Sequence, residues 1–248
     1  MATALLLRLF SVVFFTSLVL LVIVLSRSVV DAKGNKFKRK PGSANVTFSH
    51  YVLAITTRAG FCSTTPKCDR RKPSALPWTI HGLWPSNNRS KESPTSCPVS
   101  SGFSLQELEP LHEALNLFWP SYIQNSNSQF WKHEWLKHGS CSVNHTQIKG
   151  MLDYFNTTIN LFRSHNISRY LENDNIVPRP EPYKTVAFFN AISNDVNDKN
   201  INVVCKRSGN ISVAVEVRLC VNDTLQPVDC PWKGSSCRKC LYYLPSSS

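Results

Sequence analysis

The sequence is short of charged residues, and of acidic residues above all. Only 18% of its 248 residues are charged, and 16 Asp and Glu face 28 Lys and Arg, so the formal net charge is +12. So few charges beside 42% hydrophobic residues exclude a disordered polyelectrolyte, and the composition is not that of a polytopic membrane protein. Internal repeats, low-complexity tracts and mid-chain linkers are also absent. The length suits one or at most two domains with an ordinary core, which excludes a small disulfide toxin and leaves a folded, basic, globular protein.

One long apolar run, residues 9–25, lies near the N-terminus and is interrupted by three hydroxyl residues. It follows Arg8, and Val30 and Ala32 supply small residues at the usual positions before a cleavage site, so residues 1–32 are predicted to be a secretory signal peptide. A retained signal-anchor is the alternative, because about 17 apolar residues are at the lower limit for crossing a bilayer. Removing this segment takes away two arginines and one aspartate, which leaves a net charge of +11. We therefore expect a secreted, extracellular protein with no stable membrane association after signal cleavage.

All nine cysteines follow this segment, and in an oxidising compartment they predict a disulfide framework. Cys237 and Cys240 form a C-x-x-C motif, but no second pair and no paired histidine follows it, so we expect disulfides and neither a metal nor another cofactor. Because nine is odd, at least one thiol is free, intermolecular or otherwise capped. Seven N-x-S/T sequons agree with passage through the secretory pathway. The glycosylation candidates are Asn45, Asn88, Asn144, Asn156, Asn166, Asn210 and Asn222.

The mature chain is predicted to consist of an arm, one domain and a tail. Residues 33–46 hold five Lys and Arg among Gly and Ser, which predicts a flexible basic arm that is either a disordered terminus or a dedicated binding arm. We assign residues 47–241 to the folded domain and residues 242–248 to a C-terminal tail.

Hydrophobic periodicity places strands at both ends of the domain and helices in the middle. Ser104 and Glu107 form a capping-box signature for a helix that Pro120 stops. This order favours a single α+β domain over a βαβ repeat. Strands are predicted at residues 51–57, 78–82, 201–205 and 211–219, and helices at 104–118, 129–139, 147–164 and 184–193.

Side chains suited to acid–base catalysis concentrate in two segments, residues 80–85 and 130–139. If the second segment is helical, an advance of about 100° per residue places five of its side chains on one face and leaves Trp131 and Trp135 to dock on the core. Gly139 would then end the helix as a C′ glycine. The five side chains of that face are Phe130, His133, Glu134, Lys137 and His138.

Two imidazoles presented from different elements suit phosphodiester cleavage by an internal hydroxyl. One imidazole can remove a proton while the other gives one, and a neighbouring ammonium stabilises the anion between them. In RNA the 2′-OH is the nucleophile already in place, so no metal is required. Two other interpretations are a solvated helix face with i,i+4 pairs and a zincin-like site. The zincin-like site is disfavoured, because His133 and His138 are five residues apart and point about 140° away from each other.

Two segments resemble the active-site segments of the ribonuclease T2 family nearly residue for residue: 80–85 (IHGLWP) and 133–141 (HEWLKHGSC). The likeness extends from about residue 48 to residue 237. It implies an α+β fold with a central antiparallel sheet flanked by helices. It also implies a monomeric endoribonuclease that cleaves single-stranded RNA without a metal, through 2′,3′-cyclic phosphates.

The resemblance also implies a role for each matching residue. His81 would protonate the departing 5′-oxygen and His138 would take the proton of the 2′-OH, although the two roles can be exchanged without contradicting the sequence. Glu134 and Lys137 would orient groups or stabilise the transition state. His133 would contact the phosphate.

Trp84 and Phe130 resemble aromatic walls on which a base stacks, with ordinary core packing as the alternative. The sequence departs from the family nearby, since residues 56–58 are Thr-Thr-Arg where many plant members have Gln-Trp-Pro, and Ser86 stands where Asp is frequent. Both departures touch positions expected to contact bases. The cleavage chemistry should therefore carry over, whereas the base preference should not.

The resemblance further implies a disulfide pattern and a biological setting. The pairs would be Cys62–Cys68, Cys97–Cys141, Cys220–Cys230, and Cys205 with either Cys237 or Cys240. Among plant members, the S-ribonucleases of gametophytic self-incompatibility are typically basic, so the positive charge favours a pistil S-ribonuclease recognised by pollen F-box proteins. The alternatives are an acidic-type S-like enzyme of defence or phosphate recycling, a catalytically silent storage or lectin-like relative, and a cationic antimicrobial or membrane-surface protein.

Overall fold

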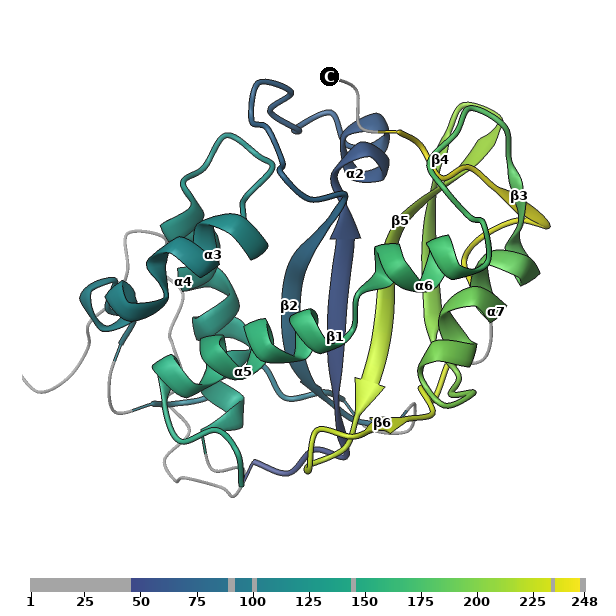
Figure 1. Cartoon of the computed structure of the whole chain (residues 1–248). Coiled ribbons are helices and arrows are strands. Elements are labelled where there is room, and N and C mark those ends of the chain that lie inside the picture. The colour runs from purple at the N-terminus through teal and green to yellow at the C-terminus, as the bar shows by residue number, and fades with distance from the viewer. Residues whose placement is uncertain (1–45, 89–91, 100–101, 144–145, 233–234, 246–248) are drawn as a thin grey trace, which may run out of the picture. The chain divides into compact units, whose positions relative to one another are not determined.

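The computed structural model describes residues 46–88, 92–99, 102–143, 146–232 and 235–245. At the centre of this part of the chain is an antiparallel sheet in the order β2-β1-β5-β4, with the short β6 paired to β5 (Figure 1). A second, two-stranded sheet pairs β3 with β7. The strands are β1 His50–Thr57, β2 Trp78–Ser86, β3 Tyr183–Lys184, β4 Asn202–Ser208, β5 Ile211–Val221, β6 Pro227–Val228 and β7 Cys240–Leu241.

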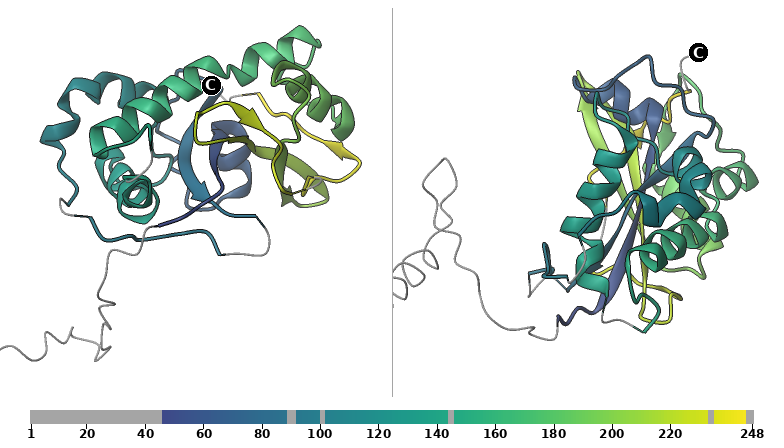
Figure 2. Two further views of the ribbon diagram at one scale, coloured as in Figure 1. Left: turned by 90° about the horizontal axis from the view of Figure 1, so that it is seen from below. Right: turned by 90° about the vertical axis from the view of Figure 1, so that its left-hand side faces the viewer.

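Helices cover one face and one edge of the central sheet (Figures 1 and 2). In Figure 1, α5, α6 and α7 lie in front of the sheet, and α3 and α4 lie beside the β2 edge. The bounds are α2 Arg58–Thr64, α3 His112–Phe118, α4 Asn127–Lys137, α5 Met151–Ser164, α6 Ile167–Asn173 and α7 Thr185–Asp195, with 3-10 turns η1 Gln106–Leu111 and η2 Gly139–Ser142. The predicted α+β fold with a central antiparallel sheet is confirmed.

The two faces of the sheet differ in chemistry because side chains alternate along each strand. Tyr51, Leu53 and Ile55 of β1 are fully buried in the main apolar core, on the face that the helices cover. Thr56 of β1 lies opposite Glu216 of β5 and shares the other face with it. That other face carries the polar residues of the candidate site.

The helix predicted at residues 104–118 is only partly correct. The side chain of Ser104 accepts a hydrogen bond from the backbone N–H of Glu107 at 3.3 Å, as a capping residue should. Pro110 then lies inside a 3-10 turn, and the α-helix begins only at His112. Proline has no N–H and crowds the preceding turn, so a regular α-helix cannot run through this position.

Two short helices and the role of one glycine were not predicted. α2 and α6 have seven residues each, too few for a clear periodic signal. Gly139 follows the C-cap His138, so the α-helix ends where it was predicted to end, but Gly139 lacks the positive φ of a C′ glycine and the chain continues into the η2 turn. Gly139 is needed for close packing instead, since a Cβ would lie 2.6 Å from Trp135 and 2.8 Å from Tyr154.

Four disulfides link the described cysteines, and all of them agree with the predicted pattern. They are Cys62–Cys68, Cys97–Cys141, Cys205–Cys237 and Cys220–Cys230. The choice that the sequence left open is thereby decided in favour of Cys237. Cys240 is a free, exposed thiol in β7.

Replacing Cys240 by Ser is expected to leave the stability unchanged, whereas replacing Cys205 and Cys237 together by Ser should cost ~3–4 kcal/mol. That bridge joins residues 32 apart, and a closed loop of this length removes about this much chain entropy from the unfolded state. Urea unfolding of the two variants measures the difference. Equal losses would mean that Cys240 takes part in a bridge.

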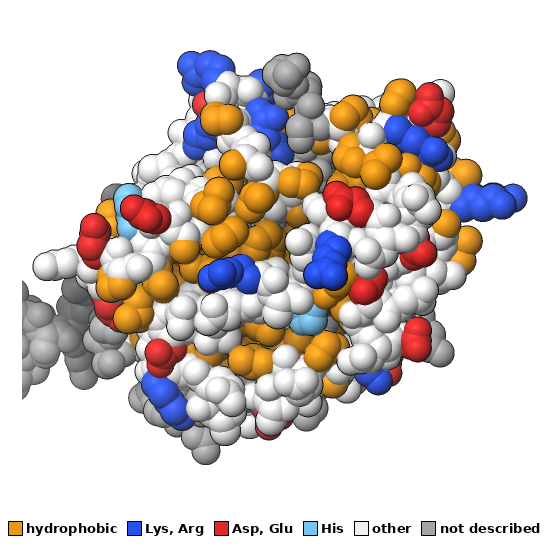
Figure 3. All heavy atoms as spheres, in the orientation of Figure 1, with side chains coloured by type: hydrophobic (Ala, Val, Ile, Leu, Met, Phe, Trp, Pro, Cys, Tyr) orange, Lys and Arg blue, Asp and Glu red, His pale blue; other side chains and the backbone are white. Residues whose placement is uncertain are grey.

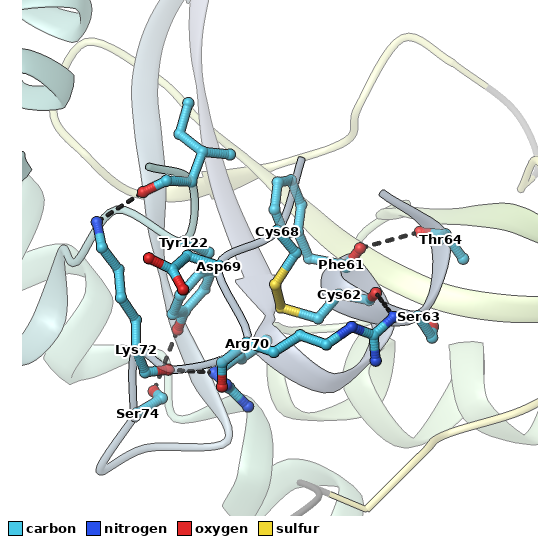
Figure 4. The surroundings of a disulfide bond; sticks show 12 residues. Phe61, Cys62, Ser63, Thr64, Cys68, Asp69, Arg70, Lys72, Ser74 and Tyr122 are labelled. Atoms are coloured by element: carbon cyan, nitrogen blue, oxygen red, sulfur yellow. Dashed lines mark hydrogen bonds between the residues drawn. A yellow bond between two sulfur atoms is a disulfide. The ribbon is translucent and has the colours of Figure 1, made fainter. Parts of the chain in front are cut away.

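The Cys62–Cys68 disulfide joins α2 to the segment between α2 and β2 (Figure 4). This segment forms hydrogen bonds to the backbone of residues 121–125. Lys72 donates from Nζ to the backbone oxygens of Ile123 and Asn125, both at 2.6 Å. The buried guanidinium of Arg58 donates to the backbone oxygen of Lys72 at 2.8 Å. Lys and Arg side chains also gather over this segment at the top of the molecule (Figure 3).

The predicted signal peptide at residues 1–32, nearly all of the basic arm and residues 246–248 lie outside the described residues. The predicted end of the domain at residue 241 is too early, because Tyr242 pairs with Val213 and Tyr243 is buried in the main core. In the part that is described, no helix is both long and apolar enough to cross a membrane.

Candidate active site

His81 occupies a bulge in β2. Its neighbours Ile80 and Gly82 pair with consecutive residues of β1, so His81 is the extra residue of the strand. A bulge re-aims one side chain while the strand continues on both sides. The carbonyl oxygen of His81 accepts a hydrogen bond from Nε1 of Trp119 at 2.9 Å, which ties the bulge to the end of α3.

The imidazole of His81 contacts a buried carboxylate in β5. Nδ1 of His81 lies 2.6 Å from Oε2 of Glu216, whose side chain is 7% exposed. Oε1 of Glu216 accepts from Nε of Arg218 at 2.6 Å, and Oε2 also accepts from Oγ1 of Thr56 at 3.2 Å. β5 has its own bulge next to Glu216, where Val215 is the extra residue.

Sequence reasoning missed Glu216 and Arg218. A usable signal was present, because they are the two charged residues of the otherwise mainly apolar strand at 211–221. Their spacing of two places both on one face of the sheet. Only the register against β1, which sets Glu216 opposite Thr56, brings them to His81.

α4 presents the second half of the site. It begins with a capping box, in which Ser126 and Gln129 each accept a hydrogen bond from the other's backbone N–H. Trp131 and Trp135 are each 1% exposed, which confirms that they dock the helix on the core. Nε1 of Trp131 also donates to the backbone oxygen of Trp119 at 2.8 Å.

The predicted polar face of α4 is present but unevenly exposed. His133 and Lys137 are exposed, Phe130 is half-buried, and His138 is half-buried at the C-cap. Glu134 is buried, and its Oε2 accepts a hydrogen bond from Nε1 of Trp84 at 2.9 Å.

Trp84 connects the strand half of the site with the helix half. Its ring centroid lies 5.0 Å from that of His81 and 5.3 Å from that of His138. Gly82 permits this approach, because a Cβ there would come within 2.3 Å of both Oε2 of Glu134 and Nε1 of Trp84. The two imidazoles predicted from separate segments therefore meet around one indole ring.

A cleft of about 740 Å³ opens beside His81. His81, His133, Glu134 and Glu216 belong to its polar lining, and Phe130 to its apolar lining. Its size is in the range of small-molecule binding sites. Lys72 anchors the backbone of residues 121–125, so the segment between α2 and β2 holds one wall of the cleft in place.

The pKa values of the two imidazoles move in opposite directions. Burial opposes the charged form of His81, but the hydrogen bond and negative charge of Glu216 outweigh it, so the pKa of His81 is raised. Burial lowers the pKa of His138 to about 3, and the nearby cations contribute to this. Burial and the charge of Lys137 also lower the pKa of His133. Compared with an ordinary histidine, the charged form is thus favoured at His81 and the neutral form at His138.

The two buried carboxyls also differ. Burial raises the pKa of Glu134 to about 7, although the charge of His81 and the hydrogen bond from Trp84 oppose the change. Burial acts in the same direction on Glu216, but there the hydrogen bonds and charges of His81 and Arg218 prevail, and its pKa is lowered. Glu216 is therefore the ionised carboxylate of the site.

Glu134→Gln is expected to stabilise the protein above about pH 7 and to leave its stability unchanged near pH 4. Folding raises the pKa of this carboxyl from 4.5 to about 7, so between those values the folded state binds more protons and stability falls as the pH rises. This rise in the pKa of Glu134 lowers the free energy of unfolding by ~3 kcal/mol at and above pH 7. Urea unfolding at both pH values tests this, and an equal gain at both would contradict it.

The residues that depart from the family pattern form hydrogen bonds within the fold. Thr56 donates to Glu216, the guanidinium of Arg58 binds backbone oxygens of residues 70 and 72, and Ser86 donates to the backbone oxygen of Trp84 at 3.0 Å. Among the described residues, no three His, Cys, Asp or Glu side chains are grouped so as to hold one metal ion.

The sequon asparagines in the described part lie at the surface. Asn88, Asn156, Asn166 and Asn210 are exposed, and Asn222 is half-buried. Oδ1 of Asn166 caps α6 by accepting from the backbone N–H of Arg169 at 3.1 Å. Asn45 and Asn144 lie outside the described residues.

A sheet and a helix that bring imidazoles and buried carboxyls together define an α+β protein with a candidate active site beside a cleft, and comparisons with known proteins identify its family. The sequence model of the Ribonuclease T2 family matches residues 48–230. The chain therefore belongs to the ribonuclease T2 family and is an endoribonuclease.

Individual relatives agree with this assignment. The chain is 34% identical to Ribonuclease DdI of Dictyostelium discoideum over 201 residues, which cover 80% of this chain and 83% of the relative. It is 29% identical to Ribonuclease S-3 of Pyrus pyrifolia over 193 residues, 76% of this chain and 84% of the relative. The crystal structure of RNase NT in complex with 5′-AMP superposes with a TM-score of 0.72 at 27% identity, over 80% of this chain and 99% of that one.

Proposed function

We propose that the protein cleaves single-stranded RNA by metal-free transphosphorylation through 2′,3′-cyclic phosphates, with His81 as the acid and His138 as the base. The observation that carries the proposal is the opposite displacement of two imidazole pKa values around one indole ring. A raised pKa keeps His81 protonated and able to protonate the departing 5′-oxygen. A lowered pKa keeps His138 neutral and able to take the proton of the 2′-OH.

Substrate binding is expected to make His138 more basic. Burial is the main cause of its low pKa, and the positive charges of Lys137, His133 and His81 add to it. An RNA phosphate bound among these cations brings a negative charge that offsets their effect. The pKa of His138 then rises toward the working pH, where a general base is most effective.

Three further residues would support this exchange of protons. Lys137 and His133 are exposed beside His138. The positive charge of Lys137 can stabilise the phosphorane, and the ring N–H of His133 can donate a hydrogen bond to the phosphate. Glu134 holds the Trp84 indole, against which both imidazoles lie, and so would orient the acid and the base.

The cleft would hold a base of the RNA. Phe130 lines it, with its ring centroid 6.0 Å from that of His81, and offers a surface for stacking. Trp84 is held by Glu134 and lies against both imidazoles, so we assign it the role of supporting the two rings. The net positive charge should make RNA binding strongly salt-dependent.

Product analysis tests the proposal. Single-stranded RNA is incubated with the protein in EDTA, and the products are followed by phosphorus NMR. We expect cleavage to continue, with 2′,3′-cyclic phosphates formed first. Loss of activity in EDTA that returns with a divalent metal, or products with a free 3′-hydroxyl, would contradict it.

The cellular setting is also a proposal. We infer that residues 1–32 are cleaved, that residues 33–46 form a basic arm, and that the folded domain, which includes Tyr243, is secreted as a glycosylated monomer. Exposed sequon asparagines in the described part support glycosylation. N-terminal sequencing, mass spectrometry and light scattering of the protein from the medium test these points. A retained N-terminal segment would show a membrane anchor instead.

A pistil S-ribonuclease of gametophytic self-incompatibility is the biological role we favour. The charge of +12 for the chain and its similarity to Ribonuclease S-3 of Pyrus pyrifolia support it. Pollen F-box proteins would then be partners. Expression confined to styles, with arrest of pollen tubes that share its haplotype, is expected. Induction in leaves by phosphate starvation would favour an S-like enzyme.

A further inference from the structure

A carboxylate that the steps above do not use, Glu216, is in direct contact with the proposed acid. Its Oε2 lies 2.6 Å from Nδ1 of His81. Because Nδ1 is engaged, Nε2 is the ring nitrogen of His81 available to a substrate in the cleft. A carboxylate in this position can fix both the orientation and the protonation of an imidazole.

Glu216 is itself held firmly. Arg218 binds its other oxygen at 2.6 Å, and Thr56 donates to Oε2 at 3.2 Å. The residue is 5% exposed, so neither oxygen can easily exchange these partners for water. The bulges at His81 and Val215 are the local irregularities of β2 and β5 that accompany this contact.

The charges around His81 come from two elements. β5 contributes the negative charge of Glu216 and the positive charge of Arg218, while α4 contributes the titratable groups Glu134, His133 and, at its C-cap, His138. Arg218 acts on His81 in the opposite sense to Glu216, since its charge disfavours a protonated imidazole and it shares the same carboxylate. Its guanidinium also lies 5.3 Å from the centroid of the Trp84 ring.

We propose that Glu216 is a positioning residue for the reaction proposed above, holding His81 protonated with Nε2 free for the substrate, and that Arg218 limits how strongly it does so. The inference rests on the proposed function for its catalytic consequence. The contact between Glu216 and His81 is independent of the proposed function, because it is present without RNA.

Substitution at Glu216 and at Arg218 should shift the pH dependence in opposite directions. An acid must be protonated to work, so activity is lost as the pH rises through the pKa of His81. Glu216→Gln removes the charge that favours the protonated ring, and the alkaline limb of the kcat profile should move to lower pH. At neutral pH kcat should fall roughly 10- to 100-fold, less than for loss of the acid itself, with KM little changed. Arg218→Gln should move the same limb to higher pH.

Glu172→Gln on α6 is the matched control, because it removes the same charge from an exposed position. Its profile should be that of the wild type. Glu216→Asp keeps the charge on a shorter side chain and should retain part of the lost rate. If Glu216→Gln does not fold, Arg218→Gln still tests the inference through the opposite shift.

NMR titration of the His81 ring in the protein without RNA separates this inference from the proposed function. The midpoint should fall in Glu216→Gln and rise in Arg218→Gln. Midpoints that move in this way in a protein that does not cleave RNA would overturn the proposed function and leave the contact standing. Cleavage of RNA with neither the midpoint nor the pH profile changed in Glu216→Gln would overturn the inference.

Discussion

Replacing His81 or His138 by Ala is expected to lower kcat on single-stranded RNA by roughly 10²- to 10⁴-fold each, which is the contribution of a general acid or base. The two rings lie against the same indole, and they serve one proton exchange, so losing either should stop it. KM should change far less, because the cleft and the remaining cations still bind RNA. Steady-state cleavage assays of the purified variants measure both constants.

His112→Ala is the control for this pair, because His112 is an exposed histidine at the start of α3. It should keep the wild-type rate. Circular dichroism of all three variants establishes that they fold. Full activity in folded His81→Ala and His138→Ala would contradict the acid–base account and place the proton transfers on other residues.

Gly60→Ala is expected to destabilise the fold by about 3 kcal/mol or more. A Cβ at this position would lie 1.9 Å from the backbone oxygen of Ala214 in the central strand β5. Backbone on both sides must then move, since no flexible side chain is available to make room. The displaced strand also carries Glu216, so activity should fall with stability. Urea unfolding of the wild type and the variant gives the free-energy difference.

Gly102→Ala provides the comparison, because a Cβ there meets no atom within 4 Å. Its stability should lie within about 0.5 kcal/mol of the wild type. A similarly small effect for Gly60→Ala would mean that α2 does not pack against β5 as closely as the structure has it.

The sequence predicted most elements and half of the site because those signals are local. The alternation in 51–57 and 211–219 and the positions of Trp131 and Trp135 identify strands and a docked helix without any tertiary information. The residues of α4 could be placed on one face from the helical repeat alone. Three disulfide pairs followed from the resemblance without an alternative, and for Cys205 it left two candidate partners.

The part of the site that was not predicted depends on pairing between strands that are distant in the sequence. His81 and Glu216 meet only because β1 lies between β2 and β5 in one register, with one bulge in β2 and another in β5. Neither the register nor the bulges have a signature in the local sequence. The break at Pro110 was visible in the sequence, but the strong capping signal at Ser104 obscured it.

The assignment of His81 as the acid and His138 as the base is tested most directly with an RNA dinucleotide in which sulfur replaces the bridging 5′-oxygen. A thiolate leaves without being protonated, so this substrate needs a base but no acid. We predict that His81→Ala cleaves it at close to the wild-type rate, while His138→Ala remains slower by roughly 10²- to 10⁴-fold. Rescue of His138→Ala in place of His81→Ala would show that the roles are exchanged, and rescue of neither would contradict the acid–base assignment.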